Sequence, residues 1–114
     1  TSMAYLDKMR ELCQSKGIEL ILVKAPTNTW GYWWYDEWDE QILDYADIHG
    51  LSYYNLIDYA EDMGIDWQTD TYDAGIHLNV YGAEKVSRWF GEILSRAHGV
   101  PDVRSDPVTA SVWA

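Results

Sequence analysis

The stretch IELILVKAP, residues 18–26, decides the fold of this chain. The residues from Ile18 to Ala25 are mostly apolar, and Pro26 ends the run. Such a run predicts a strand that is buried on both faces, as the strands of parallel sheets are. The sequence on either side should therefore supply helices that cover this strand.

Three segments carry apolar residues at helical spacing, at residues 5–13, 38–46 and 80–97. Gly17 and Gly50 follow the first two segments. A glycine in this place commonly ends a helix, because it adopts the left-handed conformation without a steric penalty. The strand at residues 18–25 is therefore expected to lie between two helices in the sequence.

A second short strand is predicted at LSYYNLI, residues 51–57, and Asn79 is well placed to cap the last helix. The order of elements is then helix, strand, helix, strand, loop and helix, which predicts an α/β layered sheet with parallel strands. Two strands are few for such a sheet, and their open edges invite pairing with another chain. We therefore expect the C-terminal part of a larger α/β domain, or a sheet completed by a partner or a second copy.

The composition indicates one folded domain with an acidic surface. Hydrophobic residues make up 47% of the 114 residues, which is enough for a core and argues against disorder. The net charge of −11 and eight scattered basic residues argue against nucleic acid and anionic membranes as partners. No apolar run approaches the roughly 20 residues that span a bilayer. The lone Cys13 excludes an internal disulfide and leaves the compartment open, extracellular and cell-envelope locations included.

The stretch TYDAGIHLNVYGAEKV, residues 71–86, places an aspartate and a histidine directly before the longest predicted helix. Gly75 should break any helix between Asp73 and His77, so the pair is expected on a loop that folds back. A helix N-terminus disfavours an imidazolium, and a carboxylate at Asp73 or Asp70 would fix the ring tautomer. These features predict a general base with its orienting acid. In the alternative interpretation, Asp73 only begins a turn and His77 only caps it.

The segment YDAGIHLNVYGAEKV also resembles the last signature block of the SGNH, or GDSL-type, hydrolases. In that family an Asp precedes the catalytic His, and one branch continues as HLN and a GA pair into the closing helix. CQSKGIELILVKAPT is similar to the family's late helix–strand unit, and YYNLID to its final short strand. The resemblance covers residues 4–104 and implies a partial three-layer α/β/α, flavodoxin-like sheet. Residues 1–104 are then the C-terminal part of such a domain, and residues 105–114 are expected to be an irregular tail.

The resemblance implies a serine esterase that cleaves acyl esters, carbohydrate-linked ones among them. His77 resembles its general base and Asp73 the residue that orients the base. Two features depart from the family pattern: Asp73 precedes His77 by four residues where three are usual, and no Gly-Asp-Ser block with its oxyanion donors is found. Because these groups supply the largest catalytic effects, we expect the 114-residue chain alone to be inactive.

No cofactor and no metal are expected. Asp66, Asp70, Asp73 and His77 bear atoms that bind metals, but their spacing matches neither the calcium-loop pattern nor the zinc helix motif.

A third stretch, WGYWWYDEW at residues 30–38, combines aromatic rings with two carboxylates. Aromatic faces beside carboxylates suit sugar rings, and a loop after a strand lies where α/β folds bind ligands. The stretch therefore predicts a ligand-binding surface at Trp30, Trp33 and Trp34, and an alternative function as a non-catalytic carbohydrate-binding or interaction module. In the competing interpretation these aromatics pack over the sheet or fill an interface.

Overall fold

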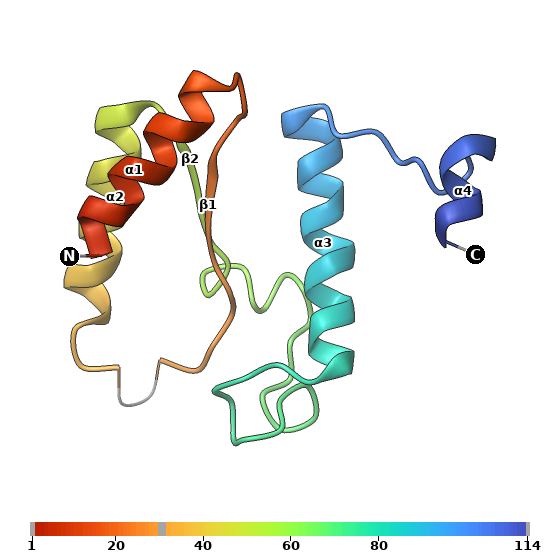
Figure 1. Cartoon of the computed structure of the whole chain (residues 1–114). Coiled ribbons are helices and arrows are strands. Elements are labelled where there is room, and N and C mark those ends of the chain that lie inside the picture. Colours follow the sequence, from red (N-terminus) through yellow and green to blue (C-terminus); the bar gives the residue numbers. More distant parts are fainter. Residues whose placement is uncertain (1, 30–31, 114) are drawn as a thin grey trace. The chain divides into compact units, whose positions relative to one another are not determined.

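The computed structural model describes residues 2–29 and 32–113 of the chain. Within them it has α/β character, with helices and a two-stranded parallel sheet (Figure 1). The chain divides into two compact units, residues 1–60 and residues 61–114. The first contains α1 (Ser2–Ser15), β1 (Ile21–Lys24), α2 (Tyr35–His49) and β2 (Ser52–Asn55), and the second contains α3 (Val80–His98) and α4 (Pro107–Trp113).

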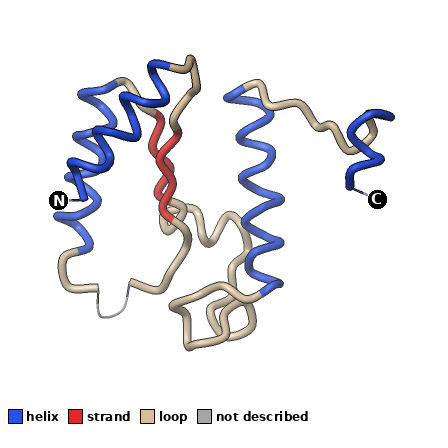
Figure 2. The backbone as a smooth tube through the Cα atoms, viewed as in Figure 1, coloured by secondary structure: helices blue, strands red, loops and turns tan. Residues whose placement is uncertain are grey.

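The two strands pair in parallel, as the order of elements predicted. Ile21 lies opposite Ser52 and Lys24 opposite Asn55, and the chain crosses from one strand to the other through α2. Figure 2 shows the two strands side by side. Each strand is four residues long and so shorter than its apolar run. Both strands end at the same edge, where Lys24 and Asn55 are neighbours.

The helices of the first unit end where the glycines predicted. Gly50 has φ 64°, and its amide donates to carbonyls in the last turn of α2. Gly17, after α1, also has a positive φ of 66°. Tyr45 links the two helices, because its hydroxyl donates to Asp7 at 2.7 Å and accepts from Arg10 at 3.0 Å.

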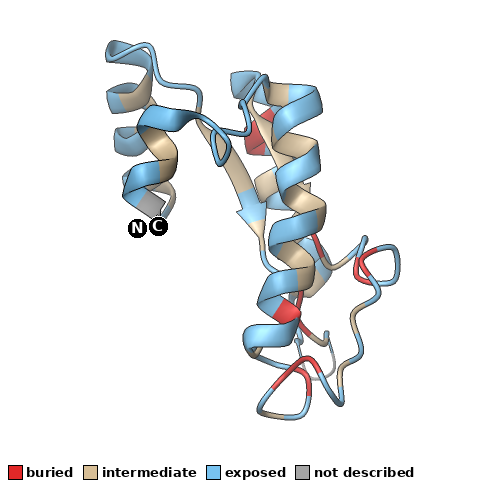
Figure 3. Cartoon of the chain, turned by 90° about the vertical axis from the view of Figure 1, so that its right-hand side faces the viewer, coloured by how far each residue is buried: buried red, intermediate tan, exposed pale blue. Residues whose placement is uncertain are grey.

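The core is thin, and this corrects the expectation of a strand covered on both faces. Ile21 and Leu22 are half-buried, and Val23 is 45% exposed. Figure 3 shows how little of the described chain is fully buried. The physical reason is that a two-stranded sheet lacks the neighbouring strands and the second helix layer that would cover β1.

The lack of periodicity in residues 105–114 predicted an irregular tail, but the chain forms α4 within this segment. Pro107 occupies the first helical position, where its fixed φ suits a helix and its missing N–H costs nothing. Asp106 caps this helix by accepting from the Val108 amide at 3.3 Å and from the Thr109 hydroxyl. A helix of seven residues leaves too few positions for a periodic apolar pattern to show.

None of the described helices is both long enough and apolar enough to cross a membrane.

Candidate functional site

The Asp–His stretch forms a loop that is closed at its base by backbone pairing. Thr71 and Leu78 form an antiparallel bridge. One residue further out, the Asn79 amide donates to the Asp70 carbonyl at 2.9 Å. The ends of the loop are therefore held together directly before α3, and the fold-back predicted from Gly75 is present.

The tip of the loop reverses through two residues with positive φ. Ala74 has φ 59° and Gly75 has φ 104°. The left-handed conformation is unfavourable for alanine, so contacts of its neighbours must hold it. Asp73 supplies them, because its Oδ1 accepts from the backbone amides of Ile76, at 3.1 Å, and His77, at 2.6 Å. This turn accommodates the spacing of four residues between the acid and the histidine.

The same turn brings the two side chains together. Oδ2 of Asp73 contacts Nδ1 of His77 within hydrogen-bonding distance. A carboxylate at Nδ1 favours the tautomer in which Nδ1 carries the proton, which leaves Nε2 as an acceptor. The His77 side chain is 64% exposed, and its Nε2 makes no hydrogen bond within the described parts of the chain. The arrangement presents an imidazole base that is oriented by an acid and open at its reactive nitrogen.

The charge of Asp73 is stabilised by the groups that surround it. Its pKa lies below the usual carboxyl value, first because the His77 side chain donates to it and then because the backbone amides do so, while partial burial opposes the shift. Asp73 is therefore ionised at neutral pH, as an orienting acid must be.

Tyr72 lies against the histidine and was not singled out by the sequence. Its ring stacks on the His77 ring with 5.8 Å between centroids and 9° between planes. Its backbone amide also donates to the His77 carbonyl at 3.2 Å. Nothing in the spacing of Tyr72 distinguishes it from the other tyrosines, so only the geometry of the loop reveals it.

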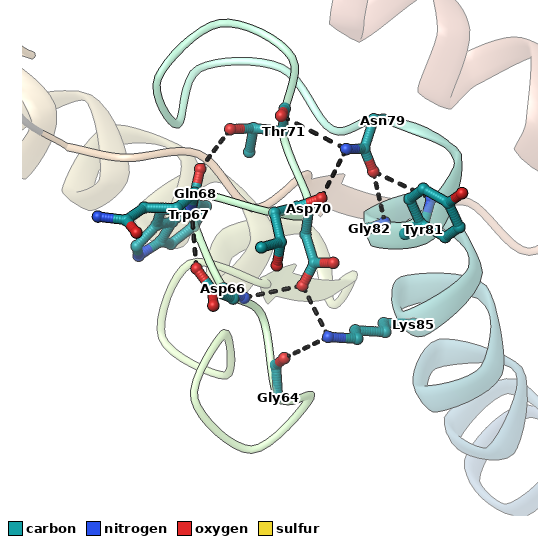
Figure 4. A network of polar contacts seen from close by, with 11 residues as sticks. Gly64, Asp66, Trp67, Gln68, Asp70, Thr71, Asn79, Tyr81, Gly82 and Lys85 are labelled. Atoms are coloured by element: carbon teal, nitrogen blue, oxygen red, sulfur yellow. Dashed lines mark hydrogen bonds and ion pairs between the residues drawn. The ribbon is translucent and has the colours of Figure 1, made fainter.

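Asp70, the alternative acid, is used elsewhere. Its Oδ2 accepts from the Lys85 ammonium at 2.7 Å and from the Asp66 amide at 2.8 Å (Figure 4). The side chain is only 4% exposed. Its pKa is lowered by the Asp66 amide first and by Lys85 second. Asp73 is therefore the acid in contact with His77, whereas Asp70 bonds to the Asp66 amide and to Lys85.

Asn79 of the HLN sequence and Gly82 of the GA pair both have structural roles where the loop meets α3. The Asn79 side-chain oxygen accepts from the amides of Tyr81, at 3.0 Å, and Gly82, at 3.1 Å, which confirms the predicted N-cap. Its NH₂ group donates to the Thr69 carbonyl at 2.8 Å, so one side chain joins loop and helix (Figure 4). A Cβ at Gly82 would lie 2.3 Å from the Asp70 carbonyl oxygen, so only glycine fits there.

The predicted aromatic surface belongs to the first unit. Trp30 lies outside the described residues. Trp33 and Trp34 are exposed, and together with Tyr32 and Trp38 they line a hollow on the surface. Their exposure excludes packing over the sheet within the described residues, which is one form of the competing interpretation, and agrees with its other form, in which they fill an interface.

The donor atoms for a metal are not gathered anywhere in the described part of the chain. No group of three or more His, Cys, Asp or Glu side chains lies close enough to hold an ion.

Comparison with protein-family models, with curated proteins and with solved structures gives no significant match for this chain. The function is therefore inferred from the geometry of residues 70–85.

Proposed function

We propose that this chain supplies the general base and the orienting acid of an SGNH-like serine esterase that hydrolyses acyl esters. The observation that carries the proposal is the contact of Asp73 with Nδ1 of His77, which leaves Nε2 open. A histidine that only caps a turn does not require a carboxylate in contact with its Nδ1. The serine nucleophile would come from sequence outside these 114 residues.

The geometry supports the following roles. A serine hydroxyl beside Nε2 of His77 would lose its proton to that nitrogen as its oxygen attacks the ester carbonyl. The imidazolium would then donate the proton to the departing alcohol, and water would release the acyl group by the same two steps. Asp73 would remain ionised throughout and stabilise the imidazolium at Nδ1.

The proposed parent domain is a three-layer α/β/α sheet of the flavodoxin-like type. The two parallel strands, the exposed Val23 and the open strand edges support this, because the further strands and helices of such a domain would pair with these edges and cover Val23. The carboxyl ends of β1 and β2 would form part of the edge at which such sheets bind ligands.

The 114-residue chain alone should be inactive, since it lacks the nucleophile and the oxyanion donors. We expect the purified chain to hydrolyse a chromogenic acetyl ester no faster than its His77→Ala variant does. Hydrolysis by the chain that disappears in His77→Ala would contradict this, because it would show that a nucleophile is already present.

The reaction itself is tested by restoring the missing part. We expect that extending the chain upstream, to include a strand followed by a Gly-Asp-Ser block, creates acetyl-ester hydrolysis that His77→Ala abolishes. His98→Ala is the matched control, because His98 lies at the end of α3 and should be dispensable. Hydrolysis that survives His77→Ala, or an upstream sequence without a serine block, would overturn the proposed function.

A further inference from the structure

Four aromatic side chains of the first unit line one hollow: Tyr32, Trp33, Trp34 and Trp38. Trp33 is 87% exposed and Trp34 is 74% exposed. Exposed apolar side chains that gather into one patch mark interaction sites, whereas apolar residues exposed singly do not. We call these four residues the aromatic surface.

Two rings of the aromatic surface, Tyr32 and Trp38, contact other side chains of the first unit. The Lys24 ammonium lies 5.5 Å from the centre of the Tyr32 ring and 5.7 Å from that of Trp38. Tyr32 also meets Tyr35 edge to face, with 5.9 Å between centroids. These contacts fix two of the four rings before any ligand arrives, which lowers the entropic cost of binding.

The sequence around the aromatic surface carries more negative than positive charge. No Lys or Arg occurs between residues 25 and 84. The first turn of α2 places the exposed carboxylates of Asp36 and Glu37 next in sequence to the tryptophans, and neither forms an ion pair within the described residues. Lys24 brings one positive charge to this surface, and the two carboxylates next in sequence outnumber it, so phosphates and acidic polysaccharides are not favoured here.

The same carboxylates distinguish a sugar from an apolar partner. A second copy of this chain offers few cations to pair with Asp36 and Glu37, because it has eight basic residues against nineteen acidic ones, so burying these carboxylates would carry a desolvation cost. Sugar hydroxyls, in contrast, donate hydrogen bonds to carboxylates while the C–H face of the ring lies on an aromatic ring.

We propose that the aromatic surface binds a neutral oligosaccharide, with successive sugar rings stacked on Trp33 and Trp34 and hydroxyls donating to Asp36 and Glu37. A quaternary ammonium ligand fits less well, because the Lys24 ammonium already lies against Tyr32 and Trp38. The proposal concerns the first unit alone and does not depend on the hydrolase proposal.

The test is a titration of the whole chain with neutral hexasaccharides (cellulose, xylan, mannan and chitin fragments), followed by tryptophan fluorescence and calorimetry. We expect at least one of them to give a saturable shift. Trp33→Ala and Trp34→Ala should each weaken its binding about tenfold, since each removes one stacked ring. Trp33→Tyr, which keeps an aromatic face, should retain most of the affinity.

Tyr5→Ala is the matched control. Tyr5 is an exposed aromatic residue of the same unit, with the Lys8 ammonium 5.3 Å from its ring centre, but it lies on α1. Its removal should leave sugar binding unchanged. Since all these side chains are exposed, circular dichroism should show the same fold in every variant.

Three outcomes would overturn the proposal. The first is no shift with any of the four sugars. The second is a shift with tetramethylammonium and none with sugar, which would assign the surface to cations. The third is a dimer that Trp33→Ala dissociates, which would assign the surface to a second copy of the chain.

Discussion

At the scale of single residues, Asp73 is the most informative position. One oxygen accepts from two backbone amides and the other contacts the His77 ring, so the residue shapes the turn and orients the base at once. A carboxylate is required for both tasks, since only it accepts at both oxygens. This double use explains how an acid four residues before the histidine reaches its Nδ1.

The pKa of Asp73 should therefore depend on His77. The imidazole is the main cause of its lowered value. We expect His77→Ala to raise the pKa of Asp73 towards the usual carboxyl value, as measured by NMR titration of the side-chain carboxyl carbon. His49→Ala, which removes a histidine of the first unit, is the control. An Asp73 pKa that is the same in wild type and His77→Ala would show that the contact does not exist in solution.

Asp70 makes the second unit sensitive to acid. Its folded-state pKa is below the unfolded value, so its stabilising effect is present above that unfolded value and is lost as pH falls through the folded pKa. We expect Lys85→Met to lower the free energy of unfolding at neutral pH by about 1 to 3 kcal/mol. It should also weaken the pH dependence at acid pH without abolishing it, because the Asp66 amide remains.

The control for this prediction is Arg88→Met. Arg88 pairs with Glu84 on the same helix, but both side chains are exposed, so the pair should contribute little. Urea unfolding at several pH values, followed by circular dichroism, measures all three proteins. Equal loss of stability in both variants would contradict the role given to Lys85.

At the scale of elements, the second unit depends on how closely α3 approaches the loop. Gly82 lies against the Asp70 carbonyl, and Asn79 bonds to both elements. The loop is therefore positioned by the first turn of the helix, and with it the Asp–His pair.

Two glycines of α3 should respond to the same substitution in opposite ways. A methyl group at Gly82 meets backbone at 2.3 Å, so Gly82→Ala should destabilise the protein by about 1 to 3 kcal/mol. At Gly91 nothing lies within 4 Å, so Gly91→Ala should stabilise the protein by about 0.5 to 1 kcal/mol through helix propensity. Thermal unfolding of the two variants gives the comparison. A neutral or stabilising Gly82→Ala would mean that the loop does not contact α3 as described.

At the scale of the whole molecule, the sheet of the described residues has two strands. Both strands have an open edge, and large apolar side chains such as Tyr5, Met9 and Val23 are exposed. Such surfaces favour association. We expect light scattering to show a concentration-dependent increase above the 13.2 kDa of one chain. Trp33→Ala should leave this increase unchanged, since Trp33 belongs to neither strand. A monomer at every concentration would contradict the prediction.

Local signals in the sequence predicted much of this arrangement. The glycine after α2, the cap at Asn79 and the parallel order of the strands are each determined by neighbours in the chain, and the structure confirms them. The pairing of Asp73 with His77 was also expected, because four residues with a glycine between them can fold back on themselves.

What the sequence did not predict depends on contacts between distant positions or on how fully a strand is covered. Lys85 reaches Asp70 across fifteen positions, and no periodic pattern marks either residue. The exposure of Val23 depends on which elements cover β1, and an apolar run does not predict those elements. The short α4 depends on its cap at Asp106 and not on an apolar face.

The central claim is that Asp73 orients His77 and leaves Nε2 free to take a proton. The measurement that tests it most directly is the ring tautomer of the neutral His77 imidazole, from the nitrogen-15 NMR shifts of wild type and Asp73→Asn. The account predicts that wild type carries its proton on Nδ1 and that Asp73→Asn loses this preference. A wild-type ring protonated on Nε2, or a preference unchanged in Asp73→Asn, would contradict it.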